Sequence, residues 1–278
     1  MMDAFMKEAA LTTGTYTATV LRSMIGAALI APFWFWQRTG WPDKTTMKLH
    51  IERGIISAFM ALSFFFALTK LPLAEAIAIS FIAPLVALYF ARVLLGEVIQ
   101  PKAILASVLG LAGTLVIVGG KIGQGDFDYD TALGLTSLTF SALLYAYNFV
   151  VIRKQAQLAG PVEIATFHSG IGGAVLLLFA PFLGTPPLAE AMLPLVAAGV
   201  LTVAGAMALA WAYARAEAQA LVPIEYSGFL WASVLGWAFF REAVTLPTIA
   251  GTALIVTGCW LATRSGGRKG AVKEGAAA

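Results

Sequence analysis

The stretch Ala67–Val118, which opens with Ala-Leu-Thr-Lys-Leu-Pro-Leu-Ala-Glu-Ala, aligns without a gap on Ala212–Thr263 when the chain is shifted by 145 positions. Eight of the aligned positions are identical. Further upstream the shift becomes 146, and Arg22-Ser-Met-Ile-Gly-Ala-Ala lies over His168-Ser-Gly-Ile-Gly-Gly-Ala. The second half of the chain therefore repeats the first half, which is typical of secondary transporters.

Composition indicates a membrane protein. The chain is 59% hydrophobic and only 12% charged, with a mean hydropathy of +0.83, whereas a soluble domain has about 25% charged residues. Apolar runs long enough to cross a bilayer core of about 30 Å recur along the whole sequence. The polar helix faces that a soluble helical protein would need are not seen. The one cysteine, Cys259, excludes an intramolecular disulfide and a cysteine-based metal cluster.

Apolar runs and their Gly/Pro breakers predict nine complete membrane spans. They cover about 16–36, 54–69, 72–95, 101–119, 132–152, 162–183, 192–212, 218–240 and 246–263. Because lipid offers no hydrogen-bonding partners, these spans are expected to be helices rather than open strands. We therefore expect an all-α polytopic membrane protein, built as a 5+5 inverted-repeat helix bundle.

The repeat also predicts a tenth helix at the start of the chain. Under the shift of 146, the span 132–152 maps to about −14 to 6, and Arg153 lies over Lys7. Met1–Met6 is therefore expected to be the last third of an incomplete first helix; the alternative is a short amphipathic tail over Met1–Ala10. The predicted organisation is a first repeat over 1–119, an outer connecting loop over 120–131, a second inverted repeat over 132–264 and a basic cytoplasmic tail over 265–278.

The positions of Lys and Arg predict the orientation in the membrane. With the start of the first helix on the cytoplasmic side, 13 of the 18 basic residues fall on inner segments and four on outer segments, and Arg22 lies within a helix. This bias places both termini in the cytoplasm. Five helices per repeat is an odd number, so the two copies are inverted. Such a repeat predicts a site near the membrane midplane that opens to each side in turn.

Several motifs resemble one transporter family. They are Leu71-Pro-Leu-Ala-Glu-Ala-Ile-Ala-Ile-Ser-Phe-Ile-Ala-Pro84, the helix ends Leu95-Gly96-Glu97 and Phe240-Arg241-Glu242, and Ala142-Leu-Leu-Tyr-Ala-Tyr-Asn148 followed by Arg153-Lys154. With the repeat, they make residues 1–264 resemble the drug/metabolite transporter superfamily, EamA type. The start of the chain is most similar to the branch with S-adenosylmethionine and riboflavin uptake carriers. The incomplete first helix and Arg241, which stands where the first repeat has Gly96, depart from the family pattern.

Two ionisable residues occupy corresponding positions in the repeat. A charged side chain in the middle of a membrane helix costs about 2.5–3.5 kcal/mol on insertion scales, so it indicates function. Arg22 is predicted to recognise an anionic group of the substrate. Its counterpart His168 is predicted to take part in proton-linked switching. The alternative is that each side chain braces a neighbouring helix through backbone carbonyls.

Glu225 is the third candidate within a span. It follows Pro223, which opens the backbone locally, and precedes Tyr226; its counterpart in the first repeat is Ser80. A carboxylate here is predicted to hold a cationic substrate, bind a coupling proton or pair with Arg22. The alternative is a structural ion pair.

Other polar and aromatic residues complete the predicted site. Tyr145, Asn148, Trp211 and Trp231 lie within spans, where they offer stacking surfaces and hydrogen bonds. Tyr145 and Asn148 share one helix face at their spacing of three. Asp3, Lys7 and Glu75 lie near outer helix ends, where snorkelling to the interface explains them. Glu97 and Glu242 precede Pro-started helices and are predicted to act as caps.

Together these features predict a secondary active transporter of a small organic metabolite in the cytoplasmic membrane, with protons or an exchanged solute as coupling partner. No P-loop, H-E-x-x-H or G-x-S-x-G occurs, which argues against an ATPase, metalloprotease or serine hydrolase. No metal, cofactor or nucleic acid is expected. The alternative is a membrane-embedded enzyme or a receptor-like binding module. Within transport, uptake of S-adenosylmethionine- or riboflavin-like metabolites and export of amino acids or drugs both stay open.

Overall fold

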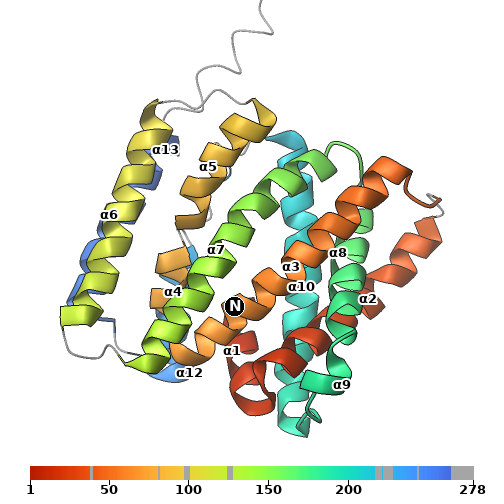
Figure 1. Cartoon of the computed structure of the whole chain (residues 1–278), viewed down its shortest axis with the longest axis horizontal. Helices are drawn as coiled ribbons and strands as arrows, with labels where there is room; N and C mark the ends of the chain where they lie inside the picture. Colours follow the sequence, from red (N-terminus) through yellow and green to blue (C-terminus); the bar gives the residue numbers. More distant parts are fainter. Residues whose placement is uncertain are drawn as a thin grey trace, which may run out of the picture.

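The protein is described by a computed structural model that covers residues 1–37, 40–80, 82–96, 101–123, 128–216, 221, 228–242 and 244–263. All regular elements in these ranges are helices (Figure 1). They are α1 (Met2–Thr13), α2 (Thr15–Gln37), α3 (Lys44–Lys70), α4 (Leu73–Ser80), α5 (Ile82–Leu95), α6 (Pro101–Gly123), α7 (Tyr129–Gln155), α8 (Pro161–Leu177), α9 (Ala180–Leu183), the 3-10 helix η1 (Ala189–Ala191), α10 (Met192–Arg215), α12 (Gly228–Phe240) and α13 (Leu246–Thr263). The predicted tail 265–278 lies outside the described residues.

The helices have the lengths and compositions of membrane spans. In the described ranges, α2, α3, α7 and the segment 189–215 are long and apolar enough to cross a bilayer, and shorter apolar stretches lie in α6, α8, α12 and α13. The fold is therefore the all-α polytopic membrane protein that the sequence predicts. The exact 5+5 count stays a prediction.

Local sequence signals explain where several helices begin. Asp43 caps α3, because its side chain accepts a hydrogen bond of 3.0 Å from the backbone N–H of Thr46. Asp128 caps α7 in the same way, at 2.8 Å from the N–H of Thr131. Pro161 occupies the start of α8, where its missing N–H costs nothing. The Asp43 cap extends α3 ten residues before the predicted apolar run at 54–69.

The span predicted at 72–95 is described in two parts. It consists of α4 and α5, and Phe81 between them lies outside the described residues. Pro84 has no N–H to donate to the carbonyl four residues earlier, that of Ser80. The Ser80 hydroxyl instead bonds back to the carbonyl of Ala76 at 2.8 Å.

Helix α1 extends past the predicted helix end at Met6. It continues to Thr13, and Gly14, with φ of 86°, allows the sharp turn into α2. Twelve residues make a helix of about 18 Å, so α1 is shorter than the neighbouring spans. Lys7, expected just beyond the helix, lies within it.

The ends of α5 and α12 share an unusual backbone conformation. Gly96, directly after α5, has φ of 69°, and Arg241, directly after α12, has φ of 55°. These residues correspond under the shift of 145. Arg241 therefore differs from the family pattern in its side chain but not in its backbone conformation. In both repeats the helix ends at a residue in the left-handed conformation.

The helix packing reflects the internal repeat: when each helix is replaced by its counterpart in the other half, a packed pair maps onto another packed pair (Figure 1). Helix α3 packs along α7, and the corresponding pair is α10 with α1. Helix α3 also packs on α8, as α10 does on α2. The helices α6 and α13 correspond to each other and form a pair at one side of the bundle. They approach so closely that a Cβ atom on Gly113 would lie 2.3 Å from the carbonyl oxygen of Gly251.

Candidate substrate site

A cavity of about 400 Å³ lies inside the bundle, bounded by residues of both halves of the chain. Its walls come from α1, α2, α3 and α4 in the first half and from α7, α8, α10 and the start of α12 in the second. Its polar lining consists of Asp3, Arg22, Ser57, Ser80, Ser141, Tyr145 and His168. Four of the nine predicted site residues therefore face one cavity: Arg22, Ser80, Tyr145 and His168.

Two apolar clusters flank this cavity. The first packs side chains of α1, α3, α4 and α12, including Met6, Phe65 and Leu73. The second packs α5, α7 and α10, including Phe149 and Tyr213. Residue Ala142 of the second cluster also lines the cavity, as Phe65 of the first does. Both clusters thus contribute apolar residues to the cavity lining, and apolar surroundings strengthen electrostatic interactions within the cavity.

Arg22 is the main cationic group of the cavity wall. Its side chain is buried, with 7% of the residue exposed, and one Nη donates to Thr202 Oγ1 on α10 at 3.1 Å. The guanidinium also lies over the ring of Phe65 on α3, 5.2 Å from its centroid. Within the described structure its Nε–H has no hydrogen-bond partner and no carboxylate is near enough for an ion pair. Arg22 thus retains donor capacity toward the cavity.

His168 and Asp3 complete the charged lining. The Nδ1 atom of His168 is buried and has no hydrogen-bond partner among the described residues. His168 interacts electrostatically with Arg22, as Asp3 on α1 does. Asp3 was interpreted as an interfacial, snorkelling residue, but it faces the cavity instead. The described lining thus combines a cation, a carboxylate and a titratable imidazole.

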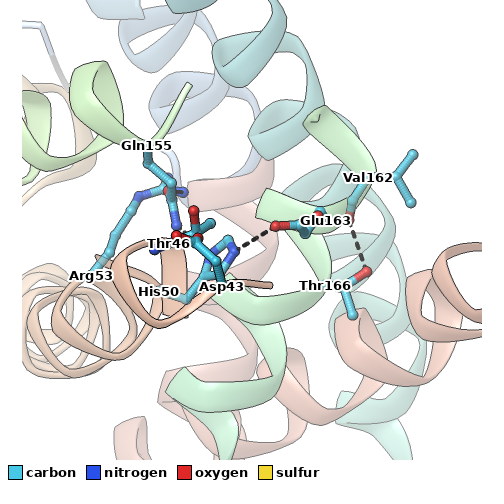
Figure 2. A network of polar contacts seen from close by, with 8 residues as sticks. All are labelled: Asp43, Thr46, His50, Arg53, Gln155, Val162, Glu163 and Thr166. Atoms are coloured by element: carbon cyan, nitrogen blue, oxygen red, sulfur yellow. Dashed lines mark hydrogen bonds and ion pairs between the residues drawn. The ribbon is translucent and has the colours of Figure 1, made fainter. Parts of the chain in front are cut away.

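Asn148 is not among the described lining residues of the cavity and belongs to a polar network that joins α3, α7 and α8. Figure 2 shows Arg53, Gln155, His50 and Glu163 of this network. Its Oδ1 accepts from Arg53 Nε at 3.2 Å, and Arg53 Nη1 donates to Gln155 Oε1 at 2.9 Å. Gln155 Nε2 in turn lies 2.5 Å from His50 Nδ1, and His50 Nε2 lies 3.0 Å from Glu163 Oε1. This pattern fits a His50 that carries its proton on Nε2.

Trp211 and Trp231 are not among the described residues that line the cavity. Trp211 is 55% exposed on α10, where its ring stacks under the guanidinium of Arg215, and Trp231 is 65% exposed on α12. Both point away from the described cavity lining, toward the outer surface of the bundle. Glu225 and Tyr226 lie outside the described residues.

Lys7 is buried and contacts two other segments of the chain, whereas snorkelling predicted an interfacial position. It is 6% exposed, and its Nζ donates to the carbonyl of Leu71 at 2.9 Å and pairs with Glu242 at 2.5 Å. The second Glu242 oxygen accepts from the N–H of Leu73 at 2.8 Å, which caps the start of α4. Glu242 thus caps a helix of the other half and not the helix that follows it. Its counterpart Glu97 lies outside the described residues.

Comparison with known proteins identifies the family. The model of the EamA-like transporter family matches residues 1–119 and 132–264. The chain belongs to this family. The pseudopaline exporter CntI of Pseudomonas aeruginosa is 28% identical over 268 residues, which are 95% of this chain and 92% of that protein. A riboflavin transporter of Brucella anthropi is 25% identical over 214 residues, 75% of this chain and 73% of the relative.

Further relatives agree with this assignment. The aromatic amino acid exporter YddG of Ancylobacter novellus is 30% identical over 112 residues, which are 40% of this chain and 38% of that protein. A solved crystal structure has the same fold, with a TM-score of 0.72 at 22% identity over 96% of this chain and 95% of the other. The family and the names of its members indicate membrane transport of small molecules rather than enzymatic activity.

Proposed function

We propose that this EamA-family protein is a secondary carrier that moves a small organic metabolite with an acidic group across the cytoplasmic membrane. This proposal depends on the environment of the Arg22 side chain. A buried guanidinium on a cavity wall, with an unpartnered N–H and no neighbouring ion-pair partner in the described structure, favours an anionic ligand group. Asp3 on the same wall provides a place for an amine, so zwitterions fit as well as anions.

Alternating access is supported by the repeat and by the position of the cavity. The polar groups share the cavity lining with residues of two apolar clusters, Phe65 of the first and Ala142 of the second, and the lining comes from helices of both halves. Rocking of the two halves would separate one cluster while the other stays closed. The Lys7–Glu242 pair joins the two halves at the end that the basic-residue bias assigns to the outside.

Proton coupling is assigned to His168 and Glu225. His168 presents a buried, unpartnered Nδ1 beside Arg22 in the described structure, so a change in its protonation alters the charge next to the substrate group. Glu225 enters by sequence alone, as the counterpart of the cavity residue Ser80. The relatives include proteins named as exporters, and direction is to be read from flux measurements.

A binding screen of the purified full chain tests the substrate class. Anionic and zwitterionic metabolites should raise the melting temperature, cationic ones should not, and Arg22→Gln should abolish the increase. Lys48→Gln, which removes an exposed charge at the start of α3 far from any cavity residue along that helix, is the matched control. Stabilisation by cations alone would overturn the assignment of Arg22.

Flux into proteoliposomes tests the coupling. Uptake should respond to an imposed pH gradient, and Glu225→Gln or His168→Gln should remove this response. Coupling to protons would be excluded if flux ignored the gradient and the Glu225→Gln carrier transported normally.

A further inference from the structure

A second arginine lies next to the cavity, one helical turn from its wall. Arg53 on α3 is 3% exposed, and its two hydrogen bonds go to neutral amides, Asn148 and Gln155. A guanidinium has five N–H donors. These two bonds leave the others without a protein acceptor in the described part of the chain.

The positive charge of Arg53 is not balanced by a direct partner. Among the described residues no carboxylate lies within ion-pair distance of it. The nearest carboxylate along the network is Glu163, which is reached only through Gln155 and His50 (Figure 2). A buried charge without a counter-charge is strongly unfavourable. The arrangement therefore favours binding of an anion close to Arg53.

Arg53 is connected directly to cavity residues. Ser57, one turn further along α3, lines the cavity and its hydroxyl reaches the same Asn148 oxygen at 3.4 Å. Tyr145, also on the wall, interacts electrostatically with Arg53. His168 on the opposite helix α8 interacts with both Arg53 and Arg22. Arg22 thus lines the cavity on α2, and Arg53 on α3 is linked to its wall through Asn148 and Ser57.

The fold itself does not require this polar group. Under the shift of 146, Asn148 corresponds to Met2 and Gln155 to Ala9, both apolar. The first half thus closes the equivalent region with ordinary packing, and Ala9 belongs to its apolar cluster. Amide side chains that bind an arginine occur only in the second half at these positions, although the first half shows that the same fold accepts apolar residues there.

We propose that Arg53 is a second anion-binding residue of the cavity and that the transported metabolite carries two separated acidic groups, one bound by Arg22 and the other by Arg53. Asn148 and Gln155 position the guanidinium, and Ser57 and Tyr145, each one helical turn from a member of this network, line the cavity. This inference rests on the proposed function, because it assumes that Arg22 binds the first acidic group.

Pairs of acids that differ only in the second carboxylate provide the probes. The full chain in nanodiscs is titrated with butyrate and succinate, hexanoate and adipate, and octanoate and suberate. For at least one pair the diacid should bind at least about tenfold more tightly than the monoacid, which corresponds to about 1.4 kcal/mol. Arg53→Gln should reduce the diacid to the affinity of the monoacid. Arg22→Gln should weaken both acids, and Lys48→Gln neither.

A second variant separates anion binding from a bracing role and does not depend on the stability of Arg53→Gln. Asn148→Asp places a carboxylate on the Arg53 Nε–H, so the protein supplies its own anion. It should raise the melting temperature of the empty carrier and remove the preference for diacids. If Arg53 only braced the helices, Asn148→Asp should raise the melting temperature without changing the preference for diacids over monoacids.

Each outcome is decisive for one of the two proposals. Equal affinities for diacids and monoacids in the unmodified chain, or a diacid preference that survives Arg53→Gln and Asn148→Asp, would overturn the role of Arg53 and leave Arg22 in place. Failure of every acid to bind, together with no effect of Arg22→Gln, would instead reject the proposed function.

Discussion

Lys7 and Arg153 bind corresponding backbone carbonyls in the two halves of the chain. Lys7 Nζ donates to the carbonyl of Leu71 at 2.9 Å, and Arg153 Nη1 donates to the carbonyl of Ala216 at 3.2 Å. Lys7 and Arg153 are related by the shift of 146, and Leu71 and Ala216 by the shift of 145. In each half, a cation on the first helix thus holds the chain directly after the third. If the halves are inverted, the two contacts lie at opposite ends of the bundle.

Removing one partner of the Lys7–Glu242 pair should destabilise the protein. Lys7→Met leaves the Glu242 carboxylate largely buried without its cation, which typically costs about 3 kcal/mol or more. The double variant Lys7→Met/Glu242→Gln should recover part of this loss, because no unpaired charge then remains. Unfolding in detergent of four proteins, the parent, Lys7→Met, Glu242→Gln and the double variant, completes a double-mutant cycle. Strictly additive losses would show that the pair contributes no coupling.

Arg241→Gly should stabilise the carrier. Arg241 adopts a left-handed conformation, which costs an L-residue with a side chain roughly 1–2 kcal/mol and costs glycine little. The side chain is exposed, so few contacts are lost. Gly96→Ala at the corresponding corner should lose a similar amount, since no neighbouring atom lies within 4 Å of the added Cβ and only the backbone is strained. Equal melting temperatures for Arg241→Gly and the parent would contradict this account.

The cap of α3 should make stability depend on pH in the acid range. Hydrogen bonds from the hydroxyl and the backbone N–H of Thr46 hold the pKa of Asp43 below its ordinary value of 3.8. Because the folded pKa is depressed, the contribution of the ionised cap is complete above pH 3.8 and is lost as pH falls through the folded pKa. Asp43→Asn retains an acceptor at every pH. The difference in melting temperature between parent and variant should therefore shrink in acid, and a constant difference would exclude this linkage.

Much of the bundle could be predicted from sequence because a bilayer imposes helix lengths and the repeat relates distant segments. Arg22 and His168 were found because each is the polar exception in an apolar helix, at matching positions. The same reasoning could not predict that Tyr145 lines the cavity whereas Trp211 lies on the outer surface. In a membrane helix the lipid-facing surface is as apolar as the buried one, so hydrophobic periodicity does not distinguish them. The exposed position of Trp211 depends on packing with other helices.

The sequence does not predict a role for Arg53 next to the site, and it predicts the wrong environment for Lys7. Arg53 directly precedes the apolar run at 54–69 and was counted among inner loop residues, whereas the Asp43 cap starts α3 earlier and places Arg53 inside the helix. Lys7 was interpreted from its nearness to a helix end. Its partners Leu71 and Glu242 lie 64 and 235 positions away in sequence, and only the folded chain brings them together.

The contacts of Lys7 and Arg153 should act as opposing gates if the halves alternate. If both termini are cytoplasmic, as the basic-residue bias predicts, Lys7→Gln weakens the outer end and should favour the outward-open state, whereas Arg153→Gln should favour the inward-open state. A cysteine at cavity residue Ala142, in a Cys259→Ala background, reports on both. Its labelling by a membrane-impermeant maleimide should speed up severalfold from the outside for Lys7→Gln and from the inside for Arg153→Gln, since about 1.4 kcal/mol shifts a population tenfold. Faster labelling from the same side in both variants would show that the two contacts are not opposing gates, whatever their similarity in sequence and geometry.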